Sequence, residues 1–86
     1  MNIYVGNLNY RVNETDLKEV FEDYGTVVSA KIIMDKFSGK SKGFGFVEMD
    51  DNSAANKAIE ELNGAIYEKR EMVVNEARPK KENYNN

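Results

Sequence analysis

Hydrophobic and polar positions follow a regular pattern along most of the chain. Short runs in which β-branched and aromatic residues alternate with other residues predict strands, and apolar residues at spacings of three and four predict helices. On this basis we predict strands over 2–6, 27–34, 43–49 and 72–75, and helices over 14–24 and about 52–63. The predicted order is strand, helix, strand, strand, helix, strand.

The predicted helices carry recognisable start and stop signals. Asn13 is expected to be an N-cap, and Asp16 three residues later completes an approximate capping box. Gly25 and the pair Asn63-Gly64 end the two apolar patterns, as glycines commonly do after a helix. Between the second helix and the last strand, residues 65–71 form a connector with room for a small hairpin around 65–67.

This order of elements predicts an α+β fold of the ferredoxin-like βαββαβ type. In that sandwich a four-stranded antiparallel sheet carries both helices on one face and leaves the other face open to water. We predict one domain over residues 1–79. The polar residues 80–86, beyond Pro79, are expected to form a disordered tail.

The alternation of side chains on the first and third strands predicts which residues lie on the open face. One side of the third strand combines charged and aromatic residues, namely Lys42, Phe44, Phe46 and Glu48. The other side, with the neighbouring positions of the first strand, is apolar: Val47, Met49, Ile3 and Val5. We expect the apolar set to face the helices, which places Tyr4 and the two phenylalanines in solvent, where exposed aromatic area is typical of a binding surface. With the opposite parity these rings would be ordinary core residues.

Residues 42–49, Lys-Gly-Phe-Gly-Phe-Val-Glu-Met, match six of the seven specified positions of the RNA-recognition motif octamer. Residues 3–8, Ile-Tyr-Val-Gly-Asn-Leu, resemble the companion hexamer of that family. Over about residues 2–79 the chain resembles single-module RNA-binding proteins of the bacterial or glycine-rich type, without their glycine-rich tail. The octamer normally ends in an aromatic residue, and here parity places Met49 in the core.

The resemblance implies specific roles for these residues. Tyr4 and Phe46 would each stack on one base of single-stranded RNA, and Phe44 would pack against sugar rings between them. Lys42 would pair with a phosphate, and groups over residues 75–78 would contact base edges. The full predicted RNA-binding set is Tyr4, Asn7, Lys31, Lys42, Phe44, Phe46, Asn75 and Arg78.

The net charge of −3 is unevenly distributed along the chain. Residues 14–24 carry −4 and residues 50–63 carry −3, so the remainder carries +4. The predicted helices are therefore acidic, and the sheet, loops and tail are basic. Such a distribution can attract a polyanion to one face of an acidic molecule. The acidic helix faces would be either solvated surface or a docking site for a protein.

Several function classes are disfavoured by what the sequence lacks. With no His and no Cys, the chain has neither the usual zinc ligands nor the usual general base near neutral pH. Gly39-Lys40-Ser41 does not complete a phosphate-binding loop, because Met34 stands where the first glycine belongs. We expect no cofactor and no catalysis. No apolar run approaches the roughly 20 residues of a membrane span, and no signal peptide is visible, so we expect a cytoplasmic protein without a membrane partner. We also expect a monomer.

The leading hypothesis is a non-catalytic module that binds single-stranded RNA in post-transcriptional regulation. Single-stranded DNA remains open as a second ligand. The alternative is a protein-interaction module of the same fold, in which the sheet or the acidic helices hold a polypeptide. A small hydrolase of the acylphosphatase type would need a glycine-rich phosphate loop after the first strand, and residues 7–11, Asn-Leu-Asn-Tyr-Arg, do not supply one.

Overall fold

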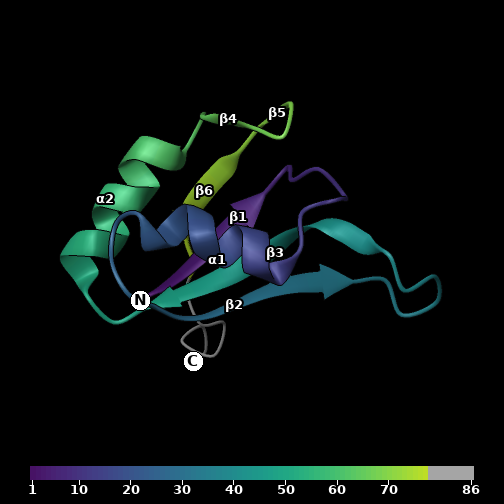
Figure 1. Cartoon of the computed structure of the whole chain (residues 1–86), viewed down its shortest axis with the longest axis horizontal. Helices are drawn as coiled ribbons and strands as arrows, with labels where there is room; N and C mark the ends of the chain where they lie inside the picture. Colours follow the sequence, from purple (N-terminus) through teal and green to yellow (C-terminus); the bar gives the residue numbers. More distant parts are fainter. Residues whose placement is uncertain (78–86) are drawn as a thin grey trace, which may run out of the picture.

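The computed structural model describes residues 1–77, which form a four-stranded antiparallel sheet, two helices and a small hairpin (Figure 1). The elements are β1 (Asn2–Gly6), α1 (Glu14–Glu22), β2 (Val27–Met34), β3 (Ser41–Met49), α2 (Asn52–Leu62), β4 (Ile66–Tyr67), β5 (Arg70–Glu71) and β6 (Val73–Glu76). The strand order β2-β3-β1-β6 and the two helices confirm the predicted ferredoxin-like α+β fold. Arg78, Pro79 and the predicted tail over 80–86 lie outside the described residues.

The bounds of three predicted elements differ slightly from those observed. Helix α1 ends at Glu22 rather than at residue 24, because the amide of Tyr24 bonds to the carbonyl of Phe21 and tightens the last turn. Strand β3 begins two residues earlier than predicted, where Ser41 pairs with Met34. The last strand is shifted by one residue to 73–76. The predicted connector does contain a hairpin, formed by β4 and β5.

Side chains cap both helices at their first turns. The Asn13 side chain accepts a hydrogen bond from the Asp16 amide at 2.8 Å, and the Asp16 carboxylate accepts one from the Asn13 amide at 3.2 Å. The predicted capping box is therefore confirmed. At α2, the Asp51 carboxylate accepts hydrogen bonds from the amides of Ser53 and Ala54 at 2.8 and 3.2 Å. Caps of this kind typically stabilise a helix by about 1 kcal/mol.

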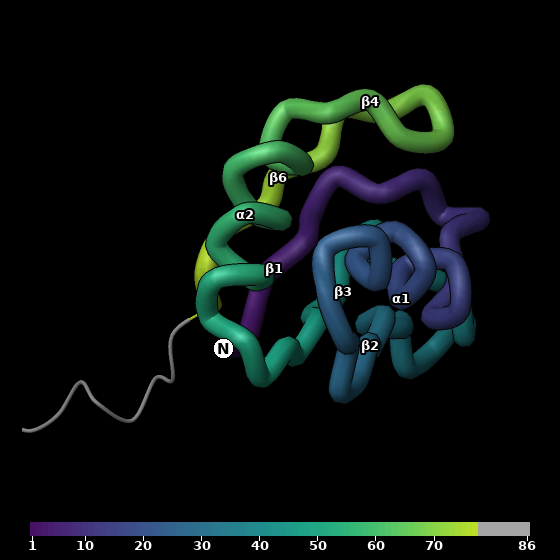
Figure 2. The backbone as a smooth tube through the Cα atoms, turned by 60° about the vertical axis from the view of Figure 1, so that its left-hand side comes forward, coloured from purple at the N-terminus to yellow at the C-terminus, as the bar shows by residue number. Residues whose placement is uncertain are grey.

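Both helices cover the same face of the sheet, and the hydrophobic core lies between the two layers. Helix α1 packs mainly on β2 and α2 mainly on β6 (Figure 2). The sheet residues predicted to face the helices, Ile3, Val5, Val47 and Met49, are all buried. They pack with Leu17 and Phe21 of α1 and with alanines of α2. None of the described helices is long and apolar enough to cross a membrane.

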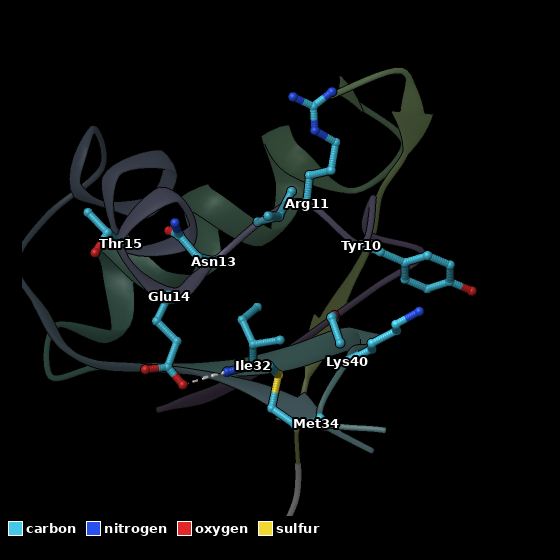
Figure 3. Close-up of a pocket in the computed structure, with 11 residues that line it drawn as sticks. Tyr10, Arg11, Asn13, Glu14, Thr15, Ile32, Met34 and Lys40 are labelled. Carbon is cyan, nitrogen blue, oxygen red and sulfur yellow. Dashed lines mark hydrogen bonds between the residues drawn. The ribbon is translucent and has the colours of Figure 1, made fainter. Parts of the chain in front are cut away.

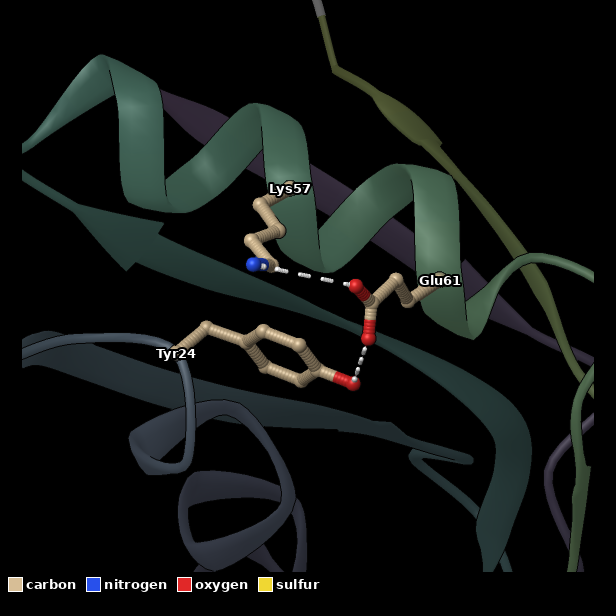
Figure 4. Close-up of polar contacts among 3 residues, drawn as sticks. All are labelled: Tyr24, Lys57 and Glu61. Atoms are coloured by element: carbon tan, nitrogen blue, oxygen red, sulfur yellow. Dashed lines mark hydrogen bonds and ion pairs between the residues drawn. The ribbon is translucent and has the colours of Figure 1, made fainter.

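A polar contact joins the end of α1 to α2. The hydroxyl of Tyr24, two residues beyond α1, donates a hydrogen bond to Glu61 Oε1 at 3.3 Å (Figure 4). The other oxygen of Glu61 lies 4.0 Å from the Lys57 ammonium one turn earlier on α2. Partial burial and the charge of Glu61 raise the pKa of Tyr24. The tyrosine therefore packs on the core and also fixes the acidic face of α2.

Candidate nucleic-acid interface

Three aromatic side chains lie together on the face of the sheet opposite the helices. We call Tyr4 of β1 and Phe44 and Phe46 of β3 the aromatic platform. The ring centroid of Tyr4 is 5.9 Å from each phenylalanine ring, and the two phenylalanine rings are 6.3 Å apart. Phe46 is 36% exposed, and the other two rings are partly exposed. The predicted parity is therefore confirmed.

Strand alternation and one glycine explain how the Tyr4 ring lies. Its strand neighbours Ile3 and Val5 are buried against the helices, so Tyr4 must point to the open face. The ring leans along β1 over Gly6: a Cβ on that residue would lie only 2.8 Å from the Tyr4 Cζ atom. A larger residue at position 6 would push the ring away. Because Gly6 has no side chain, the Tyr4 ring can lie close to the backbone of β1.

Strand register places four predicted site residues in one row across the sheet. Lys31 of β2 pairs with Phe46 of β3, Phe46 pairs with Tyr4 of β1, and Tyr4 pairs with Asn75 of β6. Lys31 and Asn75 are exposed. The row thus has a cation at one end, two rings in the middle and an amide at the other end. Single-stranded nucleic acid offers matching phosphates, base faces and base edges.

Asn7 is the predicted site residue whose side chain is already engaged within the protein. Its Nδ2 donates to the carbonyl oxygen of Glu71 at 2.7 Å, and its Oδ1 accepts from Arg70 Nη2 at 3.1 Å. Its φ of 56° turns the backbone at the end of β1. Asn7 therefore ties β1 to the β4–β5 hairpin and holds the Arg70 guanidinium in place.

A small polar hollow lies beside the platform. It has a volume of about 190 Å³, and its lining includes Tyr4, Asn7, Tyr10, Lys42, Phe44 and Arg70. Arg70 was not predicted as a site residue, because it reaches the hollow from a hairpin 63 residues beyond Asn7. The only local signal for it was a basic residue in the connector. Lys42, which the sequence does predict, lines the same hollow as Arg70.

The cations around the platform form no ion pairs with carboxylates of residues 1–77. Among residues 1–77 the ion pairs are Lys18–Glu22 at 3.8 Å and Lys57–Glu61 at 4.0 Å, both within helices. Lys31, Lys42 and Arg70 thus have no ion-pair partner in the described part of the chain. Their charge is available to a polyanion, whereas the helix lysines already have acidic neighbours. In the same range, no cluster of three or more His, Cys, Asp or Glu residues could hold a metal ion.

The tight turn between β2 and β3 is organised by one carboxylate. Asp35 Oδ1 accepts hydrogen bonds from the amides of Phe37 at 2.7 Å and Ser38 at 3.1 Å. Bonds from the Ser38 and Phe37 amides lower the pKa of Asp35. The backbone of Gly39 has a φ of 73°, which favours glycine at this position. The turn holds the ends of β2 and β3 together next to Lys40.

Comparisons with known proteins agree with this geometry. The model of the RNA recognition motif family matches residues 3–73. A curated relative from Nostoc sp. (strain PCC 7120), named "Putative RNA-binding protein RbpE", is 46% identical over 82 residues, covering 95% of this chain and 83% of its own length.

Two solved structures extend the similarity to three dimensions. The crystal structure of RNA Binding Protein PG1 has a TM-score of 0.88 and 54% identity, covering 93% of this chain and 99% of its own. A Sxl-lethal protein–RNA complex has a TM-score of 0.83 and 33% identity, covering 88% of this chain and 47% of its own. The platform residues Tyr4, Phe44 and Phe46 lie within the residues that the family model matches. The chain belongs to the RNA recognition motif family.

Proposed function

We propose that this protein binds single-stranded RNA on the open face of its sheet. The observation that carries the proposal is the cross-strand row of Lys31, Phe46, Tyr4 and Asn75, one residue from each strand. Any nucleobase has a flat π-face, so stacking on such rings stabilises a complex by about 1–3 kcal/mol per base with little sequence preference. A relative named as RNA-binding and a related RNA complex support the same ligand.

The residues of the site divide into three roles. Tyr4 and Phe46 stack on bases, and Phe44 packs against the sugars between them. Lys42 and Lys31 contact phosphates, and Asn75 contacts a base edge. Arg78, which lies outside the described residues, is proposed to extend these edge contacts. No step of this proposal requires catalysis or a cofactor, and base pairing in a duplex would hide the faces that the rings recognise.

The biological setting is proposed on broader grounds. A module spanning residues 1–79 that stacks on unpaired bases would act on transcripts, and we propose a post-transcriptional role in the cytoplasm. One exposed platform with few phosphate contacts suits a monomer with modest affinity, in the micromolar range or weaker. Single-stranded DNA offers the same base faces, and contacts to the 2′-hydroxyl would favour RNA over it.

The test is a titration of the protein with single-stranded RNA oligonucleotides, read by fluorescence anisotropy. Phe46→Ala should weaken binding by about 1–3 kcal/mol, because it removes one stacking ring. Val28→Ala is the matched control: it removes exposed apolar area from edge strand β2, outside the platform. Equal affinities for the wild type and Phe46→Ala would refute the stacking role. The salt dependence should be shallow, and a log–log slope steeper than about −5 would contradict a site with few phosphate contacts.

A further inference from the structure

A groove lies between the start of α1 and the far part of the β2–β3 hairpin (Figure 3), and none of the three platform rings lines it. Its volume is about 830 Å³, within the range of small-ligand sites. Ile32 and Met34 of β2 form one wall, and residues 12–15 at the start of α1 form the facing wall. The helix covers only part of β2, so this end of the sheet is left open.

The groove exposes apolar side chains that the fold could otherwise have buried. Met34 is 52% exposed and Tyr10 is 66% exposed, although both line the groove together with the buried side chains of Val12 and Ile32. Exposed apolar area gains about 25 cal/mol per Å² when a ligand covers it. A flat apolar group such as a nucleobase would gain from contact with this surface.

Tyr10 connects the groove to the proposed RNA site. It lines both the groove and the polar hollow beside Tyr4, Phe44 and Lys42. Its ring lies against Gly43 of β3, where a Cβ would be 3.1 Å from Tyr10 Cε1 and where φ is 83°. A strand that leaves the platform through the hollow therefore meets the Tyr10 ring before it reaches the groove.

The charges of the groove favour a polyanion at the end that adjoins the hollow. Lys40 and Tyr10 lie at that end, and Glu14 lies at the other (Figure 3). The Glu14 carboxylate accepts a hydrogen bond from the Ile32 amide at 3.1 Å, so it is engaged with the edge of β2. Within residues 1–77 Lys40 has no ion-pair partner. Its ammonium is therefore available to a phosphate at this end of the groove.

We propose that this groove is a second nucleotide site for the same RNA strand. The strand passes from the platform through the hollow and around Tyr10, and it places one further base on Met34 and Ile32 with its phosphate near Lys40. The inference rests on the proposed function, because the groove receives the strand only from an occupied platform. It adds an off-sheet contact that lengthens the binding site.

The first experiment follows the backbone amides by NMR while the protein is titrated with RNA of about 4 or about 10 nucleotides, both within the usual sizes of single-strand sites. Each length is tested as oligouridine and again as oligoadenosine. The short RNA should shift amides of Tyr4, Phe44 and Phe46 and leave those of Thr15 and Ser41 in place. The long RNA should shift both groups. If no platform amide moves, the proposed function fails; if platform amides move but groove amides do not, only the second site fails.

The second experiment uses two charge variants on the same strand. Met34→Glu places a carboxylate in the groove, and Val28→Glu places one at the other end of β2, where the side chain is 50% exposed and does not line the groove. Met34→Glu should weaken binding of the long RNA by about tenfold, the value of one stacked base, and should change the short RNA less than twofold. Val28→Glu should change both by less than twofold.

Equal effects of the two variants on the long RNA would overturn the second site, because the loss would then come from charge alone. The absence of a length-dependent loss in Met34→Glu would overturn it as well. The amide spectrum of each variant reports whether it is folded. Should Met34→Glu be unfolded, the amide shifts of the unmodified protein still decide the matter.

Discussion

The two faces of the sheet are built from alternate residues of the same strands and have opposite properties. On the helix-covered face Ile3 and Val47 are fully buried in a continuous core. On the open face their neighbours Tyr4 and Phe46 contact each other and solvent. Lysines on the helices have acidic partners, whereas the cations around the platform have none among residues 1–77. Residues one position apart on the same strand therefore contribute to different properties: one stabilises the fold and the next binds the ligand. A substitution on one face should change stability with little effect on binding, and a substitution on the other face should do the reverse.

The largest expected effect is a loss of stability caused by a substitution on the helix-covered face. Ile3→Ala should lower the free energy of unfolding by about 2–5 kcal/mol, because it removes a fully buried side chain and leaves a cavity. Chemical denaturation measures this loss. RNA affinity, measured where the variant is folded, should stay close to that of the wild type. A matching loss of affinity would mean that the two faces are coupled.

Substitution of Tyr4, the next residue on the strand, should weaken RNA binding more than it lowers stability. Tyr4→Ala should weaken RNA binding by about 1–3 kcal/mol through loss of one stacked base. Its effect on unfolding should be clearly smaller than that of Ile3→Ala, because the ring contacts solvent and the other platform rings rather than the core. Anisotropy titration and denaturation of the same preparation provide both values. Tyr4→Phe, which keeps the ring, serves as the control and should bind normally.

A smaller effect, on the salt dependence of RNA binding, is expected when a single positive charge is removed from one face or the other. Lys42→Gln should reduce the slope of log affinity against log salt by about 0.7, the contribution of one phosphate contact on a single strand. Lys18→Gln removes the same charge from α1, where the ammonium lies 3.8 Å from Glu22. That control should leave the slope unchanged. Equal changes in both variants would indicate that only the total charge of the protein matters.

The smallest effect concerns the turn that joins β2 and β3, at the edge of the proposed second site. Hydrogen bonds from the Ser38 and Phe37 amides lower the pKa of Asp35, so the charged carboxylate favours the folded turn. This contribution is present above the ordinary aspartate pKa and is lost as the pH falls through the lowered value. The protection of the Phe37 and Ser38 amides against hydrogen exchange, relative to the intrinsic exchange rate at each pH, should therefore fall under acid. Asp35→Asn, which retains an oxygen acceptor, should remove that pH dependence.

Local patterns in the chain predicted much of the fold and part of the site. The capping box at Asn13 depends on residues three positions apart, and the parity of Phe44 and Phe46 depends on neighbours along one strand. Such interactions act within a few residues, so they can be read from the chain directly. The helix end at Glu22 and the start of β3 were less well predicted, because they depend on competing turn and pairing interactions.

The long-range contacts were not predicted. Asn7 was expected to contact RNA, yet its side chain binds the β4–β5 hairpin through Arg70 and Glu71. The sequence predicts Asn63 only as a helix stop, whereas its side chain also accepts a hydrogen bond from the Val74 amide of β6 at 3.0 Å. Glu14 lies in the first turn of α1 and reaches the Ile32 amide on β2. Each contact joins elements whose relative position follows from packing of the whole core.

The chain alone was enough to establish the order of elements, the core side of each strand and the identity of the three rings, because strand and helix periods are local properties. Folding was needed to align those strands in one register, which brings Lys31, Phe46, Tyr4 and Asn75 into a row. It was also needed to bring Arg70 to the hollow and to leave β2 partly uncovered beside Tyr10. Distances between elements arise from packing and pairing across the sheet, and no segment carries that information by itself.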